Sequence, residues 1–115
     1  MSCEMTLNEY QAKARDFAKY EHSDYPFLAL PEEVGEVMGK LAKYSRKNNL
    51  SLTDCIINVD APIDDCDFKL REDLKKELGD VLWQLSACAN ELDLDLSEIA
   101  NSNLEKLKDR NKRNV

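Results

Sequence analysis

The chain has 115 residues, of which 43% are hydrophobic and 34% are charged, and its formal net charge at pH 7 is −7. This length fits one domain, residues 1–115, with enough apolar residues for a core. The negative charge excludes nonspecific binding to nucleic acid. We find no apolar run of membrane-spanning length and no basic segment ahead of an apolar stretch, so we expect a cytoplasmic protein without a membrane partner.

The cysteines point to no metal–thiolate site. Four are present, none forms a CxxC pair, and the single histidine, His22, offers no zinc partner near them. We therefore expect reduced thiols rather than a disulfide framework. The residues concerned are Cys3, Cys55, Cys66 and Cys88.

The predicted elements are helices, and strand patterns are nearly absent. Thr6 and Glu9 form a T-x-x-E capping box ahead of a helix over residues 7–20. Its apolar residues recur at helical spacing. After a loop, a second helix is predicted to begin near Phe27 or at Pro31, because proline suits a first helical turn.

A long acidic segment, residues 48–69, follows the end of this second helix at about residue 47. Such length is unusual for a connection between helices, and a short helix near residues 53–58 fits within it. Its aspartates would repel an anionic molecule, so we expect it to supply no contact to one and no essential metal ligand. Its apolar residues would dock on the bundle or on a neighbouring subunit: Ile56, Ile57 and Val59.

Two further helices complete the prediction. The third spans about residues 70–92 and has a wide apolar face. The fourth begins near Asp95, which forms a capping signal with Glu98, and ends in the basic stretch "KLKDRNKR". The fold class is therefore all-α and resembles a four-helix bundle, with the second and third helices as its core pair.

Acidic residues crowd both helices of this core pair. Glu33 and Glu36 are three positions apart and share a helix face, as do Glu77 and Asp80. Four carboxylates brought together would repel one another, and a hard cation such as Mg²⁺ or Mn²⁺ relieves that repulsion. Single acidic pairs of this spacing are also common on solvated helices.

The chain's glycines lie beside these acidic positions, inside helices where glycine is a poor former. Their missing side chains could let two helices approach closely or leave room for a ligand. They are Gly35, Gly39 and Gly79.

The order and spacing of these motifs resemble the MazG-like, all-α nucleoside triphosphate pyrophosphohydrolases. Three stretches carry the resemblance: "LALPEEVGEVMGKLAK", "LKKELGDVLWQLSACANELDLDLSEIA" and "NLEKLKDR". They contain the family's EExxE, ExxD and final N-x-x-K-L-x-x-R patterns and cover residues 27–111 apart from the loop. The interval between Glu36 and Glu77 is longer than in compact family members, and we expect the extra residues of this acidic segment to shape nucleotide selectivity or assembly.

The resemblance implies a bundle in which carboxylates of two helices hold Mg²⁺, with Mn²⁺ as an alternative. It implies hydrolysis of a nucleoside triphosphate to the monophosphate and pyrophosphate, in a homodimer or a homotetramer. Glu32 and Glu36 would be the catalytic acids, with Glu32 orienting water. The implied metal ligands are Glu33, Glu36, Glu77 and Asp80. The implied substrate-binding residues are Asn103, Lys106 and Arg110, although a basic helix end is also ordinary.

Several alternatives stay open from the sequence. A non-enzymatic helical dimer could use the acidic patch to bind a protein partner. A di-iron site is disfavoured because no Glu-x-x-His motif is present. Trp83 fits core or interface packing better than base stacking, and three residues ahead of the second helix could line a base pocket: His22, Tyr25 and Phe27.

Overall fold

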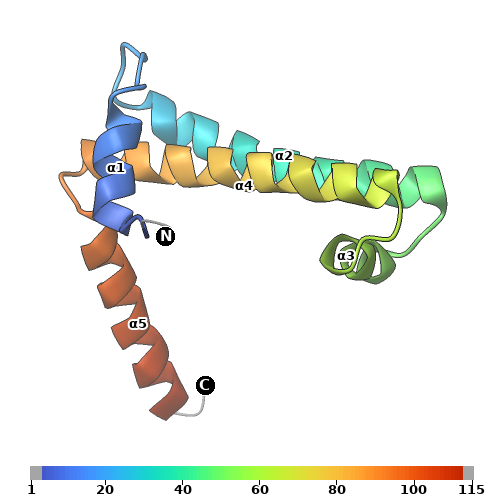
Figure 1. Cartoon of the computed structure of the whole chain (residues 1–115). Coiled ribbons are helices and arrows are strands. Elements are labelled where there is room, and N and C mark those ends of the chain that lie inside the picture. Colours follow the sequence, from blue (N-terminus) through green and yellow to red (C-terminus); the bar gives the residue numbers. More distant parts are fainter. Residues whose placement is uncertain (1–3, 113–115) are drawn as a thin grey trace. The chain divides into compact units, whose positions relative to one another are not determined.

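The computed structural model describes residues 4–112 of the chain, and the elements in that range are five helices with no strand (Figure 1). The all-α prediction is confirmed. Of the cysteines, Cys3 lies outside the described residues, and the other three are free thiols, as expected. The helices are α1 (Leu7–Arg15), α2 (Tyr25–Asn48), α3 (Leu52–Asp60), α4 (Asp65–Glu91) and α5 (Leu96–Lys112).

The chain separates into two compact units. One combines the chain up to Pro26 with the chain from Leu85 onward, and the other is Phe27–Gln84. The first unit therefore holds α1, α5 and the last residues of α4. The second unit holds most of α2, all of α3 and most of α4, and it contains both acidic motifs.

In the first unit, α1 has the predicted capping box, because Thr6 and Glu9 exchange backbone-to-side-chain hydrogen bonds. The helix ends at Arg15, five residues earlier than predicted. The next amides bond to carbonyls three residues back, as in a tightening last turn, and Phe17 is 68% exposed. Phe17 thus does not pack on the buried face of α1, and the apolar pattern predicted to continue to residue 20 ends with the helix.

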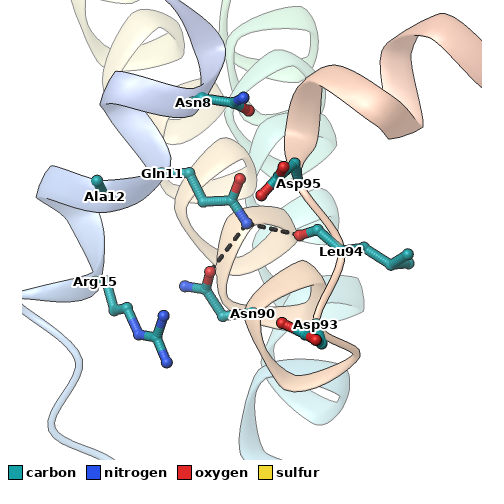
Figure 2. A pocket seen from close by; sticks show the side chains of 8 residues that line it. All are labelled: Asn8, Gln11, Ala12, Arg15, Asn90, Asp93, Leu94 and Asp95. Atoms are coloured by element: carbon teal, nitrogen blue, oxygen red, sulfur yellow. Dashed lines mark hydrogen bonds between the residues drawn. The ribbon is translucent and has the colours of Figure 1, made fainter.

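Gln11 connects α1 to the turn between α4 and α5 (Figure 2). Its Nε2 donates hydrogen bonds of 2.9 Å to Asn90 Oδ1 and to the Leu94 carbonyl oxygen. Its Oε1 accepts one of 2.8 Å from the amide of Leu96, which is the first residue of α5. The side chain is buried, and these three bonds use its donors and its acceptor.

In the second unit, α2 and α4 run antiparallel. Glu33 lies near Glu77 and Asp80, while Tyr44, further along α2, bonds to the earlier residue Asp67 of α4. Residue numbers therefore increase along α2 in the direction in which they decrease along α4. The buried apolar residues of this unit are few: Ala29, Cys55, Leu70 and Leu74.

The acidic segment is mostly helical. The short helix predicted near residues 53–58 is present as α3, and Ser51 caps it by accepting a hydrogen bond from the amide of Asp54. Cys55 of α3 is fully buried, and Arg71 of α4 donates a hydrogen bond of 2.7 Å to the Val59 carbonyl oxygen. The segment is thus attached to α4 at Val59, whereas Ile56 and Ile57, predicted to dock on the bundle or on a neighbouring subunit, are each 56% exposed in the chain.

Helix α4 begins at Asp65, five residues before the predicted start at residue 70. Asp64 accepts a hydrogen bond of 2.9 Å from the amide of Asp67, which satisfies one of the free amides of the first turn. Sequence reasoning treated these aspartates as loop residues. A D-x-x-D pattern ahead of an apolar helix was the available signal for the earlier start.

The described residues also rule out one role of the glycines. A Cβ atom added at Gly35, Gly39 or Gly79 would meet nothing within 4 Å. The interpretation that these glycines let two helices of the chain approach closely is therefore wrong. The other alternative, open space beside the acidic positions, agrees with the structure.

Candidate metal centre

Three carboxylates meet where α2 lies beside α4. Glu33, Glu77 and Asp80 each offer one oxygen, and these oxygens all lie within 4.8 Å of one another. All three residues are half-buried. The helical spacing of Glu77 and Asp80 places both on one face of α4, and the antiparallel contact brings Glu33 of α2 to that face.

Among these carboxyl groups, the charged form of Glu33 is disfavoured by its surroundings. Its pKa is raised above the ordinary value of 4.5, first by burial and then by the charges of Asp80 and Glu77. Glu32 and Glu36 add smaller effects in the same direction. The cluster therefore holds more negative charge than the protein itself compensates, which is the condition that a bound cation relieves.

The carboxylate group fits a hard divalent cation. Mg²⁺ binds oxygen ligands at about 2.0–2.1 Å, so oxygens on opposite sides of the ion are about 4 Å apart. The separations here, within 4.8 Å, need only small side-chain adjustments to reach that geometry. Three protein oxygens would leave coordination positions for water and phosphate.

The other two acids of the first motif lie outside this group. Glu32 and Glu36 are both exposed, and neither offers an oxygen within 4.8 Å of all three clustered ones. Glu36 nonetheless lies close enough to affect the pKa of Glu33. The structure thus brings together three of the four predicted metal ligands, and a ligand role for Glu36 stays a prediction.

The predicted substrate-binding residues all lie on α5, in the other unit. Asn103 and Lys106 line one pocket of about 400 Å³, together with Glu98, Ile99, Ser102 and Leu94. Arg110 is exposed and is not among the residues that line it. The first two residues are thus presented on one face of α5, as their spacing requires.

The aromatic residues ahead of the acidic motif have mixed surroundings. Tyr25 stacks on Tyr20, with ring centroids 5.8 Å apart. His22 is exposed, and Phe27 is 43% exposed. Trp83, at 37% exposed, is not a fully buried core residue of the described chain. A role in binding a base stays a prediction for His22, Tyr25 and Phe27, and packing in the core or at an interface stays the prediction for Trp83.

A buried carboxylate escaped sequence reasoning. Asp67 is 4% exposed, and it accepts hydrogen bonds from the Tyr44 hydroxyl and from the Ile63 amide. It ties the segment before α4 to α2. The sequence does not distinguish Asp67 from the exposed aspartates around it, because its burial depends on Tyr44 of another helix.

Comparison with known proteins identifies the family of the chain. The chain matches the MazG nucleotide pyrophosphohydrolase domain over residues 25–115, and it therefore belongs to that family. Membership assigns it to the nucleotide pyrophosphohydrolases, whose class of substrate is a nucleotide and which are typically metal-dependent. The resemblance seen in the sequence is thus confirmed.

The chain is also similar to the Gene 37 protein of Mycobacterium phage L5. The two are 32% identical over 120 residues, which cover 96% of this chain and 93% of that protein. No solved structure matches the chain. Among residues 4–112, no helix has both the length and the apolar character that crossing a bilayer requires.

Proposed function

We propose that the protein hydrolyses a nucleoside triphosphate to the monophosphate and pyrophosphate at the Glu33, Glu77 and Asp80 cluster. The observation that carries this proposal is the convergence of three half-buried carboxylates from two helices. The family match supports the reaction class. We also propose that residues 1–115 act as one domain, since the match extends across both units.

The clustered carboxylates would hold Mg²⁺, and Mn²⁺ suits the same oxygen donors. When bound, the ion supplies charge neutralisation for the phosphate oxygens and eases deprotonation of water. The protein as a whole carries a net charge of −7, so an anionic substrate depends on that neutralisation.

Acidic side chains of the protein would accept the proton released by the attacking water. Water attacks the α-phosphorus, the bond from that phosphorus to the bridging oxygen breaks, and pyrophosphate leaves with that oxygen. Glu36, exposed and outside the three-carboxylate group, is free to accept the proton of the attacking water. Glu32, one residue before Glu33, would orient the same water.

Residues of α5 would contact the substrate. Lys106 supplies a positive charge for phosphate oxygens, and Asn103, in the same pocket, supplies an amide for a phosphate or sugar oxygen. Arg110 is the third candidate, one turn further along the helix.

We further propose that the active form is a homodimer or a homotetramer. The second unit exposes more large apolar side chains than it buries, which a small chain cannot compensate with its own core. A second copy of the chain covering this surface would explain it. The exposed apolar side chains concerned are Phe27, Leu28, Val34, Met38, Leu52, Ile56, Ile57, Ile63, Phe68, Leu78 and Trp83.

The test of the activity is pyrophosphate release over a panel of ribo- and deoxyribonucleoside triphosphates with Mg²⁺. We expect release from at least one of them, and its loss in Asp80→Asn. Glu72→Gln is the matched control, since Glu72 is an exposed acid on the same helix, paired only with Lys75. A folded, metal-binding protein that releases no pyrophosphate from any nucleotide would support the non-enzymatic dimer instead.

A further inference from the structure

Lys40 differs from every other basic residue of the described chain. It is half-buried, whereas each remaining lysine and arginine within residues 4–112 is exposed. Keeping an ammonium group away from water costs free energy unless a partner compensates it. A half-buried lysine therefore needs an explanation that an ordinary surface lysine does not.

Lys40 lies in the α2–α4 contact, next to the carboxylate cluster. It follows Glu36 by one helical turn, and Asp73, on whose carboxyl its charge acts, precedes Glu77 by one turn. Along the contact, the carboxylate cluster is thus followed by Lys40 opposite Asp73, and then by Tyr44 bonded to Asp67.

The charge of Lys40 is not used in a close ion pair. The Asp73 carboxylate already accepts a hydrogen bond of 2.9 Å from Lys69, its neighbour by one turn on α4. Among residues 4–112, no carboxylate lies within ion-pair distance of Lys40. A lysine whose role was only structural would be expected to hold such a partner, so its charge remains available to a ligand.

We infer that Lys40 binds the pyrophosphate portion of the triphosphate substrate. The inference rests on the proposed function. Along the helix axis, Lys40 is about 6 Å from Glu36 and about 10 Å from Glu33, which is within reach of a long lysine side chain and a phosphate chain held at the cluster. Lysine is an established point-charge partner of phosphate oxygens.

The charge distribution explains why a cation is useful at this position. Phosphate groups beyond the reach of a metal ion would meet the negative field of the five acids Glu32, Glu33, Glu36, Glu77 and Asp80. A lysine one turn beyond the cluster offsets that field. Its attraction is greatest for the departing pyrophosphate, because breaking the bond adds negative charge to the leaving oxygen.

The experiment measures binding rather than turnover alone. The affinity of pyrophosphate in the presence of Mg²⁺ is determined by titration calorimetry, and that of Mn²⁺ alone is determined by electron paramagnetic resonance. In Lys40→Met we expect the dissociation constant for pyrophosphate to rise about tenfold or more, with Mn²⁺ affinity unchanged or higher. Lys40→Arg, which keeps a cation, should retain most of the pyrophosphate affinity.

Lys47→Met is the matched control, because Lys47 is an exposed lysine on the same helix. It should leave both affinities near the wild-type values. Unchanged pyrophosphate affinity in a folded Lys40→Met protein overturns the inference and leaves Lys40 as a counter-ion of the empty cluster. If Lys40→Met fails to fold, Lys40→Gln is measured instead, and unfolding of both variants assigns the lysine a structural role.

Failure of the proposed function would be distinguishable. In that case the wild-type protein releases no pyrophosphate from nucleotides, or binds no Mn²⁺. Failure of the Lys40 inference leaves both of those wild-type properties intact. Wild-type protein that binds Mn²⁺ but no pyrophosphate would also overturn the inference.

Discussion

The hydroxyl of Tyr44 donates a hydrogen bond of 2.5 Å to Oδ1 of Asp67, a carboxylate that is 4% exposed. The bond lowers the pKa of Asp67 below its ordinary value of 3.8 and is the main cause that raises the pKa of Tyr44 to about 12. Asp67 also accepts from the Ile63 amide. A single pair thus joins α2, the start of α4 and the segment between α3 and α4.

Tyr44→Phe keeps the ring and removes this hydrogen bond. Because the Asp67 pKa is lowered on folding, its carboxylate contributes stability above pH 3.8 that is lost as the pH falls through the lowered pKa. We expect the variant to unfold at lower denaturant concentration than wild type at pH 7, and the gap to shrink below pH 3.8. Chemical denaturation at several pH values measures it, and Tyr25→Phe, at an exposed tyrosine, is the control.

An equal gap at all pH values would contradict this account. It would mean that Tyr44→Phe acts through lost packing alone. The ionised state of Asp67 would then contribute nothing through Tyr44 to the free energy of unfolding.

Gln11→Leu should destabilise the protein by about 1–3 kcal/mol, since the buried Leu96 amide and two part-buried partners would lose their hydrogen bonds to Gln11. Those partners are Asn90, the Leu94 carbonyl and the Leu96 amide. Thermal unfolding measures the loss. Gln84→Leu is a matched control, because Gln84 is similarly buried at 7% exposed but makes no hydrogen bond within the described residues. Equal losses in the two variants would show that the bonds of Gln11 add nothing.

Glu33→Gln and Glu36→Gln should separate metal binding from proton transfer. Glu33→Gln removes a charge from the carboxylate cluster, so we expect loss of Mn²⁺ binding and at least about a 100-fold loss of activity. Metal-free Glu33→Gln should be more thermostable than wild type. The neutral glutamine removes a carboxylate whose charged form is disfavoured by burial and by repulsion from its neighbours.

Glu36→Gln should instead retain most Mn²⁺ affinity and lose most hydrolysis, by about 100-fold or more if it accepts the proton of water. Both variants should keep wild-type circular dichroism. Loss of Mn²⁺ binding in Glu36→Gln would instead support the predicted ligand role of Glu36. Full activity would remove it from the site. Chelation of the metal with EDTA should abolish hydrolysis by the wild type and be reversed by added Mg²⁺.

Leu78→Glu tests the assembly. Leu78 is 57% exposed on α4, next to Gly79, where a Cβ atom would meet nothing within 4 Å. If a second copy covers this surface, a buried carboxylate there would break the contact. We expect a smaller particle by light scattering at micromolar concentration, while Leu78→Met keeps the wild-type mass. Wild-type protein that is a monomer would contradict the proposed homo-oligomer.

Local patterns in the sequence determined much of this protein. The helical periodicity, the capping box at Thr6 and Glu9, and the short helix in the acidic segment depend on interactions within a few residues, and the structure agrees with each. The acidic motifs and their family resemblance also depend only on spacing along a helix. The family match confirms that resemblance.

Only the tertiary structure decided which acids meet and which are buried. Glu33 and Glu36 are equivalent by spacing, but the antiparallel contact brings Glu33 to Glu77 and Asp80 and leaves Glu36 exposed. The same contact made Lys40 half-buried and Asp67 nearly inaccessible, among lysines and aspartates that look alike in the sequence. Spacing fixes which residues share a face, whereas the partner helix and its register set the local dielectric and the neighbouring charges.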